Sequence, residues 1–291
     1  MAFEGFELSQ VDVGETDLRV RHGGSGPPLI LLHGYPQTHM MWGRVADALA
    51  RDFTVIAPDL RGYGKSGKPQ TTADHEPYSK SAMARDIVAL GRHFGFDRFN
   101  LAGHDRGARV AYRLALDHPQ SVERLCVLDV VPTNEMYETA DAKFALGTWT
   151  WFFLPQPAPV PERMLGADPD WSIWRDGAVG AGFMQPDAMA DYMEATRDPA
   201  TLHAMCEDYR AGVSIDWPRD AADKGKIKIT APLLALWGQR GAVASRFDVL
   251  EVWRAWADDV RGFAIPDCGH FIPEEQPAET VKALRAFFAP G

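Results

Sequence analysis

The chain has 291 residues, of which 46% are hydrophobic and 24% are charged, as in ordinary folded globular proteins. No apolar run reaches the roughly 20 residues of a membrane-spanning helix, and the N-terminus lacks the basic and then apolar pattern of a signal peptide. We therefore expect a cytoplasmic protein without membrane contact. The formal net charge of −10 argues against nucleic acid as a partner, because phosphate binding requires a basic surface.

Short apolar segments alternate with amphipathic ones in the first half of the chain, which is typical of an α/β fold with a mostly parallel central sheet flanked by helices. The predicted strands are apolar enough for burial on both faces. They are Pro28–His33, Thr54–Asp59, Phe99–Gly103, Arg124–Asp129, Pro232–Trp237 and Gly262–Ile265. Helical periodicity predicts helices over Met41–Arg51, Ser79–Phe94, Ala108–Leu116 and Ala278–Phe288.

The stretch from about Pro132 to Ile229 breaks this alternation. It is rich in Trp, Met, Pro and Asp and contains no convincing strand, and strand-like segments resume at Pro232. We interpret it as a helical cap inserted into an α/β core. Residues 1–133 and 230–291 form the two parts of the core in this interpretation, and residues 134–229 form the cap, which would enclose a substrate.

The segment Gly103–Gly107, with the sequence Gly-His-Asp-Arg-Gly, lies between a predicted strand and a predicted helix. This is the pattern of a nucleophile elbow, a tight turn that raises the nucleophile above the sheet, with Asp105 in place of the more common serine. Glycine tolerates the backbone angles of such a turn, and the N–H groups of the following helix favour negative charge. The alternative is that Asp105 only caps the helix.

A carboxylate nucleophile predicts a particular reaction. The side chain of Asp105 is a poor nucleophile toward amides and ordinary esters, because the anhydride that forms collapses back. It can displace a leaving group from a saturated carbon and form an ester, whose hydrolysis then requires a general base and an oxyanion hole. Carbon–halogen bonds and the C–O bonds of epoxides are the usual targets.

The predicted general base is His270, which lies on the loop after the last predicted strand, where this arrangement places its histidine. Three other histidines compete for the role. They are His33, His104 and His203, and we expect His33 and His104, which lie beside tight turns, to support the catalytic residues from behind. The neighbouring Cys268 is a second possible nucleophile, but its place on the loop that delivers the histidine favours a packing role.

The acid that orients the histidine is expected after one of two strands. No carboxylate lies in the stretch 239–243 that follows Trp237, and Asp248 falls within the next helix. The alternative position is the end of the strand before the cap, which supplies Asp129. We predict that Asp129 orients His270, although an acid at a strand end can also simply cap a turn.

Two arginines accompany the nucleophile. Arg106 follows it directly, and Arg109 lies one helical turn further along, whereas Arg113 is too deep to reach the site easily. Guanidinium groups bind carboxylates through forked, charge-assisted hydrogen bonds, so the pair predicts a small anionic substrate; the alternative is salt bridges with local acids. The backbone N–H groups of Tyr35 and Arg106 form the predicted oxyanion hole.

These features resemble the fluoroacetate and haloacetate dehalogenases of the α/β-hydrolase superfamily. The segments Gly103–Arg109, Asp129–Thr133 and Gly269–Phe271 match that family in order and spacing, and the match covers nearly the whole chain. The resemblance implies the α/β-hydrolase fold and hydrolysis of a haloacetate to glycolate and halide, with no metal and no organic cofactor. The implied roles are nucleophile for Asp105, water activation for Asp129 and His270, and carboxylate binding for Arg106 and Arg109. The family also leads us to expect a homodimer formed through the cap.

The resemblance further implies three cap side chains that hold the departing halide. The matching residues are Thr150, Trp151 and Tyr209. Thr150 departs from the family, which has a histidine there, and a hydroxyl is a shorter and weaker donor to fluoride. We therefore expect the protein to act on chloroacetate and bromoacetate, and on fluoroacetate slowly or not at all. Aromatic residues in a cap are otherwise core packing.

Two other functions remain open from the sequence. An epoxide hydrolase would use the same nucleophile and base, with cap tyrosines protonating the epoxide oxygen; Tyr137, Tyr192 and Tyr209 are available, but the paired arginines argue against it. A ligand receptor on the same fold that has lost turnover is the other class, which the complete set of catalytic residues disfavours.

Overall fold

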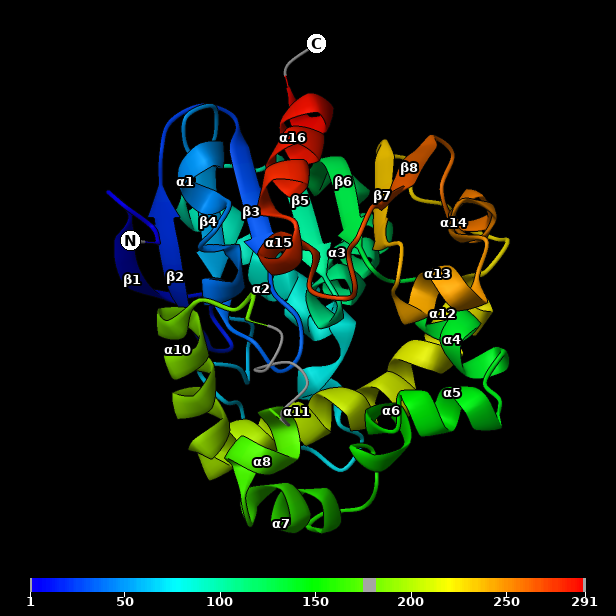
Figure 1. Ribbon diagram of the computed structural model, residues 1–291. Helices are drawn as coiled ribbons and strands as arrows, with labels where there is room; N and C mark the ends of the chain where they lie inside the picture. Colours follow the sequence, from blue (N-terminus) through cyan, green and yellow to red (C-terminus); the bar gives the residue numbers. More distant parts are fainter. Residues whose placement is uncertain (1, 175–181, 290–291) are drawn as a thin grey trace.

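The structure is a computed structural model that describes residues 2–174 and 182–289. Its centre is an eight-stranded sheet with the order β1-β2-β4-β3-β5-β6-β7-β8, in which the two pairings of β2 are antiparallel and the others are parallel (Figure 1). The strands are β1 (Glu7–Asp12), β2 (Asp17–Gly23), β3 (Pro28–Leu32), β4 (Thr54–Pro58), β5 (Phe99–His104), β6 (Val122–Leu128), β7 (Leu233–Gly238) and β8 (Val260–Ile265). The predicted fold class is therefore confirmed.

The six predicted strands are the parallel ones, and their apolar sequences are explained by burial on both faces. In β5 every residue is buried. The hairpin of β1 and β2 was not predicted, because β1 lies at the sheet edge and has a single buried residue, Val11, which leaves no apolar run to recognise. These two strands extend the sheet without contributing to the candidate active site.

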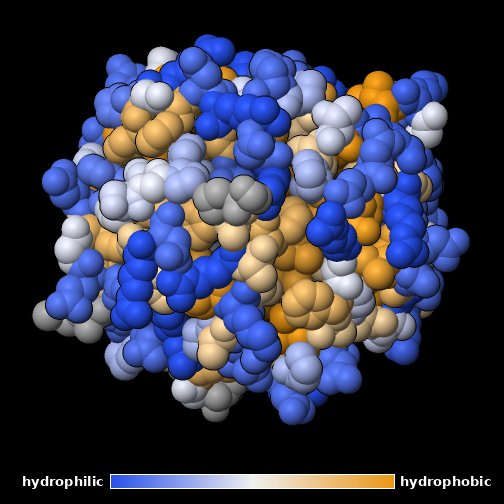
Figure 2. Space-filling view, turned by 90° about the horizontal axis from the view of Figure 1, so that it is seen from above, coloured by the Kyte–Doolittle hydropathy of each residue, from blue (hydrophilic) through white to orange (hydrophobic). Residues whose placement is uncertain are grey.

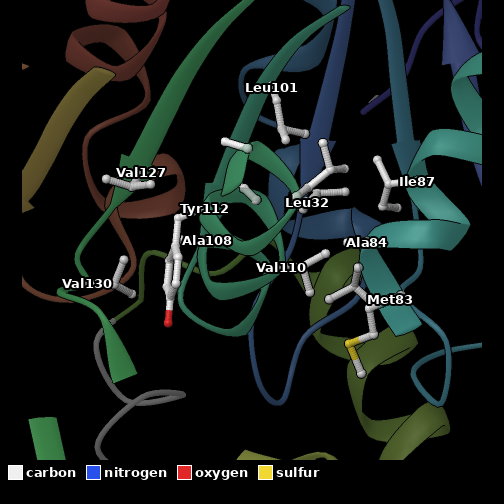
Figure 3. Packing of buried hydrophobic residues seen from close by; sticks show 14 of the residues in the cluster. Leu32, Met83, Ala84, Ile87, Leu101, Ala108, Val110, Tyr112, Val127 and Val130 are labelled. Atoms are coloured by element: carbon white, nitrogen blue, oxygen red, sulfur yellow. The ribbon is translucent and has the colours of Figure 1, made fainter. Parts of the chain in front are cut away.

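Helices cover both faces of the sheet. On one face lie α2 (Lys80–His93), α3 (Arg106–Asp117) and α14 (Val249–Trp256), and on the other lie α1 (Ala46–Leu49) and α16 (Pro277–Phe288). Alternate residues of β3 belong to the two apolar clusters: Ile30 and Leu32 to the first, Leu29 and Leu31 to the second. Figure 3 shows part of the first cluster, in which Val110 of α3 lies close to Met83 and Ala84 of α2.

The predicted helix Met41–Arg51 was wrong as a single element. The structure has a 3-10 turn over His39–Trp42 and a short helix α1 over Ala46–Leu49. Gly43 caps the first piece, and Val45 has non-helical backbone angles (φ −120°, ψ −24°), so the chain bends between them. The apolar spacing that suggested one helix is explained by burial of both pieces against the sheet.

Between β6 and β7 the chain forms a layer of helices below the sheet in Figure 1. They are α4 (Thr133–Glu138), α5 (Ala142–Gly147), α6 (Thr150–Phe153), α7 (Val160–Gly166), α8 (Pro169–Trp174), α10 (Pro186–Arg197), α11 (Pro199–Ala211) and α12 (Trp217–Asp223). A π-helical segment, Gly212–Asp216, joins the last two. The described part of the predicted cap, residues 134–174 and 182–229, contains no strand of the sheet.

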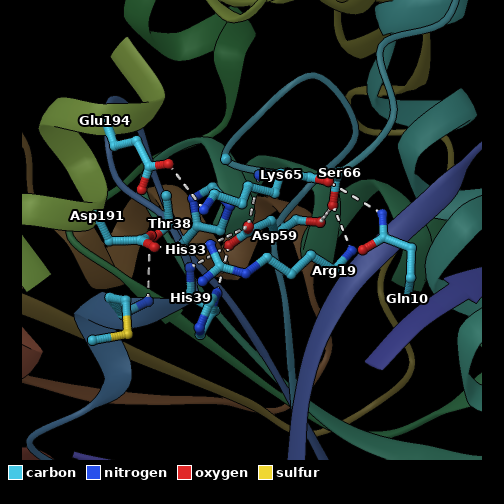
Figure 4. A network of polar contacts seen from close by, with 12 residues as sticks. Gln10, Arg19, His33, Thr38, His39, Asp59, Lys65, Ser66, Asp191 and Glu194 are labelled. Carbon is cyan, nitrogen blue, oxygen red and sulfur yellow. Dashed lines mark hydrogen bonds and ion pairs between the residues drawn. The ribbon is translucent and has the colours of Figure 1, made fainter. Parts of the chain in front are cut away.

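A network of hydrogen bonds and ion pairs connects α10 of the cap to the core (Figure 4). Asp191 accepts hydrogen bonds from Arg19 Nη1 at 2.8 Å and from Thr38 Oγ1 at 2.6 Å, and Glu194 pairs with Lys65 at 3.0 Å. Because these partners come from β2 and from loops at the edge of the sheet, the network holds this end of the cap in a defined position over the core.

The side of the molecule opposite the cap is seen in Figure 2, where hydrophilic residues are interspersed with smaller hydrophobic areas. This mixture is ordinary for a protein surface in water. Within the described ranges, no helix combines the length and the apolar character needed to cross a membrane.

Candidate active site

The turn between β5 and α3 has the geometry of a nucleophile elbow. Asp105 has φ +47° and ψ −116°, a conformation that L-residues rarely adopt. A Cβ on Gly103 would lie 2.5 Å from the carbonyl oxygen of Gly107, and one on Gly107 would lie 2.3 Å from that of His33. The two glycines of the motif are therefore required by close backbone contacts, and the turn holds the Asp105 carboxylate at the end of the sheet.

His270 lies between two carboxylates. Its Nδ1 is 2.6 Å from Asp129 Oδ2, and its Nε2 is 3.8 Å from Asp105 Oδ2. The other oxygen of Asp129 accepts a hydrogen bond from the Gly238 N–H at 3.0 Å. Asp129 is thus held by backbone and can fix the orientation and tautomer of the imidazole, leaving Nε2 directed toward the Asp105 side of the site.

The electrostatics of this triad favour an ionised nucleophile. Burial by itself would raise the pKa of Asp105, but the charges of His270, Arg109 and Arg106 outweigh it and lower the pKa below its ordinary value. Burial would by itself lower the pKa of His270, yet the hydrogen bond that its Nδ1–H donates to Asp129 and the charges of Asp129 and Asp105 raise it to about 9. In the resting site Asp105 is therefore an anion beside a protonated imidazole.

The competing histidines occupy supporting positions. His104 Nε2 donates to the carbonyl oxygen of His270 at 2.8 Å, and burial lowers the pKa of His104 to about 4, so that it stays neutral. His33 Nε2 accepts from the Leu60 N–H at 2.9 Å and shapes the loop after β3. His203 is remote from the triad and binds Glu162 and a threonine of the core.

Two further alternatives are explained by packing. Cys268 is fully buried, and burial raises the pKa of its thiol to about 12, so no thiolate is available at neutral pH. Asp248 caps α14 by accepting from the Glu251 N–H at 3.0 Å, which occupies its carboxylate away from His270. Gly241 instead packs against Asp129: a Cβ there would lie 3.1 Å from its Oδ1.

The two arginines beside the nucleophile differ sharply. The guanidinium of Arg106 is bound by Asp208, with Nη2 2.6 Å from Oδ1 and Nε 2.9 Å from Oδ2. Arg109 donates from Nη1 to the carbonyl of Val131 at 3.0 Å and to the hydroxyl of Thr133 at 3.2 Å, and its buried Nε has no partner. Among the described residues Arg109 forms no ion pair within 4 Å, and its charge acts on the Asp105 carboxylate in the same cavity, whose pKa it helps to lower.

Arg113 does not reach the candidate active site, as its position further along α3 predicted. It pairs with Asp117, Asp220 and Asp223 at the far end of α3 and takes no part in the site.

The partner of Arg106, Asp208, was missed from the sequence. It directly precedes Tyr209 on α11, and a buried arginine near a buried aspartate could have suggested the pair, but nothing local assigns that partner among the chain's many acids.

The triad opens into a cavity of about 340 Å³ between the core and the cap. Its walls include Asp105, Asp129, His270 and Arg109 from the core and Thr150, Trp151 and Tyr209 from the cap, but not the side chain of Arg106. The structure therefore brings together all but one of the predicted side chains. Phe271 and Ile173 add apolar surface, as is common for a small-molecule site.

The cap wall is positioned by its rings. The guanidinium of Arg106 lies 4.1 Å from the ring centroid of Tyr209, and that of Arg109 lies 4.5 Å from the ring of Trp151. The rings of Trp151 and Tyr209 meet edge to face at 6.3 Å. Burial and the negative charge of Asp105 raise the pKa of Tyr209 well above its ordinary value, so its O–H remains a donor.

The predicted oxyanion hole is partly occupied by the resting nucleophile. The N–H of Tyr35 donates to Asp105 Oδ1 at 2.9 Å. Gly34 permits this approach, because a Cβ on it would lie 2.5 Å from that of Asp105. Arg106 begins α3, so its backbone N–H has no acceptor within the helix.

The loop that carries His270 has a support that the sequence did not reveal. Glu275 accepts hydrogen bonds from the N–H of Gly269 at 2.7 Å and from that of Phe271 at 2.8 Å, one on either side of the histidine. These two hydrogen bonds hold the backbone of the loop in place, and they thereby fix the position of the His270 imidazole.

Comparison with known proteins places the chain in a family. The model of the alpha/beta hydrolase fold family matches residues 27–277, and the chain belongs to this family. A fluoroacetate dehalogenase from Burkholderia sp is 46% identical over 99% of this chain and 95% of the relative. The predicted resemblance to fluoroacetate dehalogenases is thus confirmed.

Two other similarities complete the comparison. A soluble epoxide hydrolase from Corynebacterium sp. (strain C12) is 34% identical, with 92% of each chain covered. The crystal structure of ALR0039 from Nostoc sp PCC 7120, described as an alpha/beta hydrolase, has a TM-score of 0.96 and 46% identity, covering 99% of this chain and 100% of that one. Both agree with hydrolase activity as the general function.

Proposed function

We propose that the protein is a hydrolytic dehalogenase that converts haloacetates to glycolate and halide through an ester on Asp105. The observation that carries the proposal is Arg109, a buried cation without an acidic partner among the described residues, in the wall of a small cavity that also contains an ionised Asp105. A buried charge is costly unless it is paired, and the carboxylate of the substrate supplies the missing partner. The dehalogenase relative supports the same chemistry.

Substrate binding follows from the difference between the arginines. Arg109 binds the carboxylate directly through its free guanidinium edge. Arg106 is fixed on Asp208 and under the ring of Tyr209, so we assign its side chain to positioning that ring, and its backbone N–H to the oxyanion hole. The two-arginine clamp suggested by the sequence becomes one direct ligand and one support in this proposal.

The first step is displacement at the α-carbon. Asp105 Oδ1 is held by the Tyr35 N–H, whereas Oδ2 faces His270, so Oδ2 is the attacking atom. It forms a bond to the α-carbon on the side opposite the halogen, and the halide leaves with the bonding electrons. Trp151 and Tyr209 donate N–H and O–H hydrogen bonds to the departing halide from the cap.

The second step is hydrolysis of the ester. Esterification removes the negative charge of Asp105, which is one of the causes that raise the pKa of His270, so the imidazole then loses its proton more easily. Neutral His270 takes a proton from water, the water oxygen adds to the carboxyl carbon, and Tyr35 and Arg106 N–H groups stabilise the oxyanion at Oδ1. The bond from that carbon to Oδ2 breaks, glycolate leaves after receiving the proton from His270, and Asp105 retains the oxygen from water.

The decisive experiment uses His270→Ala. The first step does not need the imidazole as a base, so this variant should release about one halide per enzyme from chloroacetate and then stop, while Asp105 gains a carboxymethyl group. Mass spectrometry of the peptide containing Asp105 detects the adduct, and wild type in ¹⁸O-water should label the same side chain. Halide release without an adduct, or ¹⁸O found first in glycolate, would contradict the ester.

Epoxide hydrolysis is the alternative raised by the second relative. It needs cap tyrosines as acids, but the hydroxyl of Tyr137 donates to the carbonyl of Trp151 at 3.3 Å and that of Tyr192 to Glu274 at 3.1 Å. Of these three cap tyrosines only Tyr209 lines the cavity. Rapid turnover of styrene oxide with no halide release from haloacetates would favour this alternative.

A further inference from the structure

A second cavity, of about 530 Å³, adjoins the candidate active site. It lies between α5 of the cap and α13 (Ala242–Arg246) of the core. Gly147, Thr148 and Ala242 belong to the walls of both cavities. Gly147 and Ala242 are also exposed to solvent, so the outer cavity leads from the surface to the wall of the inner one.

The outer cavity contains two cations and one anion among the charged side chains of its wall. Lys143 and Arg246 are opposed by Asp141 alone, which leaves a local charge of +1 in a chain whose formal net charge is −10. Lys143 is exposed and forms no ion pair with any residue the structure describes. The charges on this wall therefore favour a small anion here more than the acidic protein as a whole does.

Arg246 can exchange its present partner, Asp141, for the carboxylate of an incoming anion. Its Nη1 lies 3.1 Å from Asp141 Oδ1, its Nε is buried without a partner, and its guanidinium lies 4.8 Å from the ring centroid of Phe144. Asp141 is more than half exposed and already caps α5 by accepting from the Phe144 N–H at 2.7 Å. Asp141 thus keeps a partner when an incoming carboxylate takes its place on Arg246.

We propose that the outer cavity is a binding site for small carboxylate anions, through which the substrate reaches Arg109. The inference rests on the proposed function for the identity of its ligand. Arg246 and Lys143 bind the carboxylate at the outer position, and the anion then passes the junction at Gly147, Thr148 and Ala242 into the inner cavity.

A larger side chain at Gly147 tests whether the substrate passes the junction between the two cavities. A Cβ on Gly147 would meet no atom within 4 Å, so the space beside this residue is open where a side chain would begin. Gly147→Phe should lower kcat/KM for chloroacetate several-fold while Tm stays close to that of wild type. Leu146→Phe, the matched control, adds a ring at the neighbouring exposed residue, which lies in neither cavity wall, and should change neither. Wild-type kcat/KM in Gly147→Phe would show that the substrate arrives by another path and would overturn the proposal.

The outer charge is tested against a matched charge elsewhere. Arg246→Gln should raise KM for chloroacetate by up to about ten-fold at low ionic strength, and the difference should shrink as salt screens the charge. Arg261→Gln changes the net charge equally but lies on β8, with a side chain 71% exposed, and should leave KM unchanged. If both variants raised KM equally, the change would come from the net charge of the protein and not from a binding site in the outer cavity.

A measurement without turnover separates this inference from the proposed function. Iodide quenches indole fluorescence on contact, and Trp149 and Trp151 line the inner cavity. The difference in iodide quenching between wild type and Trp151→Phe gives the part of the quenching that comes from Trp151. Gly147→Phe should reduce this part. If wild type releases no halide from any haloacetate, the proposed function fails, and the passage still stands or falls on this quenching; unchanged quenching in Gly147→Phe would reject it.

Discussion

The core edge and the cap wall of the candidate active site are built in different ways. Asp105 and Asp129 both have positive φ, at +47° and +53°, and both follow strands of the central sheet, so backbone geometry and main-chain hydrogen bonds hold them. Trp151 and Tyr209 lie on α6 and α11 and are held by contacts with rings and guanidinium groups. This contrast suggests that the core determines which reaction occurs and the cap determines which substrate and leaving group are accepted.

The largest expected effect comes from the core. Asp105→Ala should reduce halide release by about 10⁴-fold or more, because the group that forms the bond is lost. Halide release from chloroacetate, with circular dichroism to check folding, measures this effect. Trp151→Phe keeps the fold and the nucleophile and should retain measurable activity. If Asp105→Ala remained comparable with Trp151→Phe, the division between core and cap would be wrong.

The next effect concerns the substrate carboxylate. Arg109→Gln should raise KM for chloroacetate by roughly 10- to 100-fold, since a hydrogen bond to a charged group contributes about 1.5–3 kcal/mol. Arg109→Lys should recover part of the loss, because the charge returns without the forked geometry. Steady-state kinetics give KM and kcat separately. A loss confined to kcat with unchanged KM would contradict direct binding of the substrate by Arg109.

The cap wall should control leaving-group preference. Thr150→His should raise the rate with fluoroacetate relative to chloroacetate by about ten-fold, because fluoride depends most on hydrogen bonds as it leaves. Thr150→Val, which removes the hydroxyl at similar size, should shift the ratio in the opposite direction. The ratio of halide-release rates for the two substrates is the measurement. Equal wild-type rates on both substrates would remove the role assigned to Thr150.

The smallest effect is a difference in pH dependence between the two steps. The first step requires only ionised Asp105, whose pKa is lowered, so the halide burst should stay constant from mildly acidic pH through the range near pH 9 in which His270 loses its proton. Ester hydrolysis requires neutral His270, so its rate should rise with pH and level off below pH 9, since the ester lacks the charge that helped raise this pKa. Rapid-quench measurement of both steps tests the difference; parallel profiles would contradict it.

The sequence by itself determined the six strands β3 to β8 of the sheet, the elbow and the reactive residues near it. Apolar runs such as Leu29–Leu32 identify buried strands, and the glycines around Asp105 identify the turn, because both signals are local and depend on backbone sterics. The position of Asp129 at a strand end followed from the absence of an acid after Trp237. These features need no knowledge of distant contacts.

Only the tertiary structure decided how the two arginines differ, which cavity the cap encloses and where the outer cavity meets it. Arg106 and Arg109 are equivalent in the sequence, but Asp208, 102 residues away from Arg106, forms an ion pair with Arg106 and none with Arg109. The break of the segment Met41–Arg51 and the support of His270 by Glu275 are also set by packing and hydrogen bonds. Charge pairing acts through space rather than along the chain, so residue type and spacing cannot assign it.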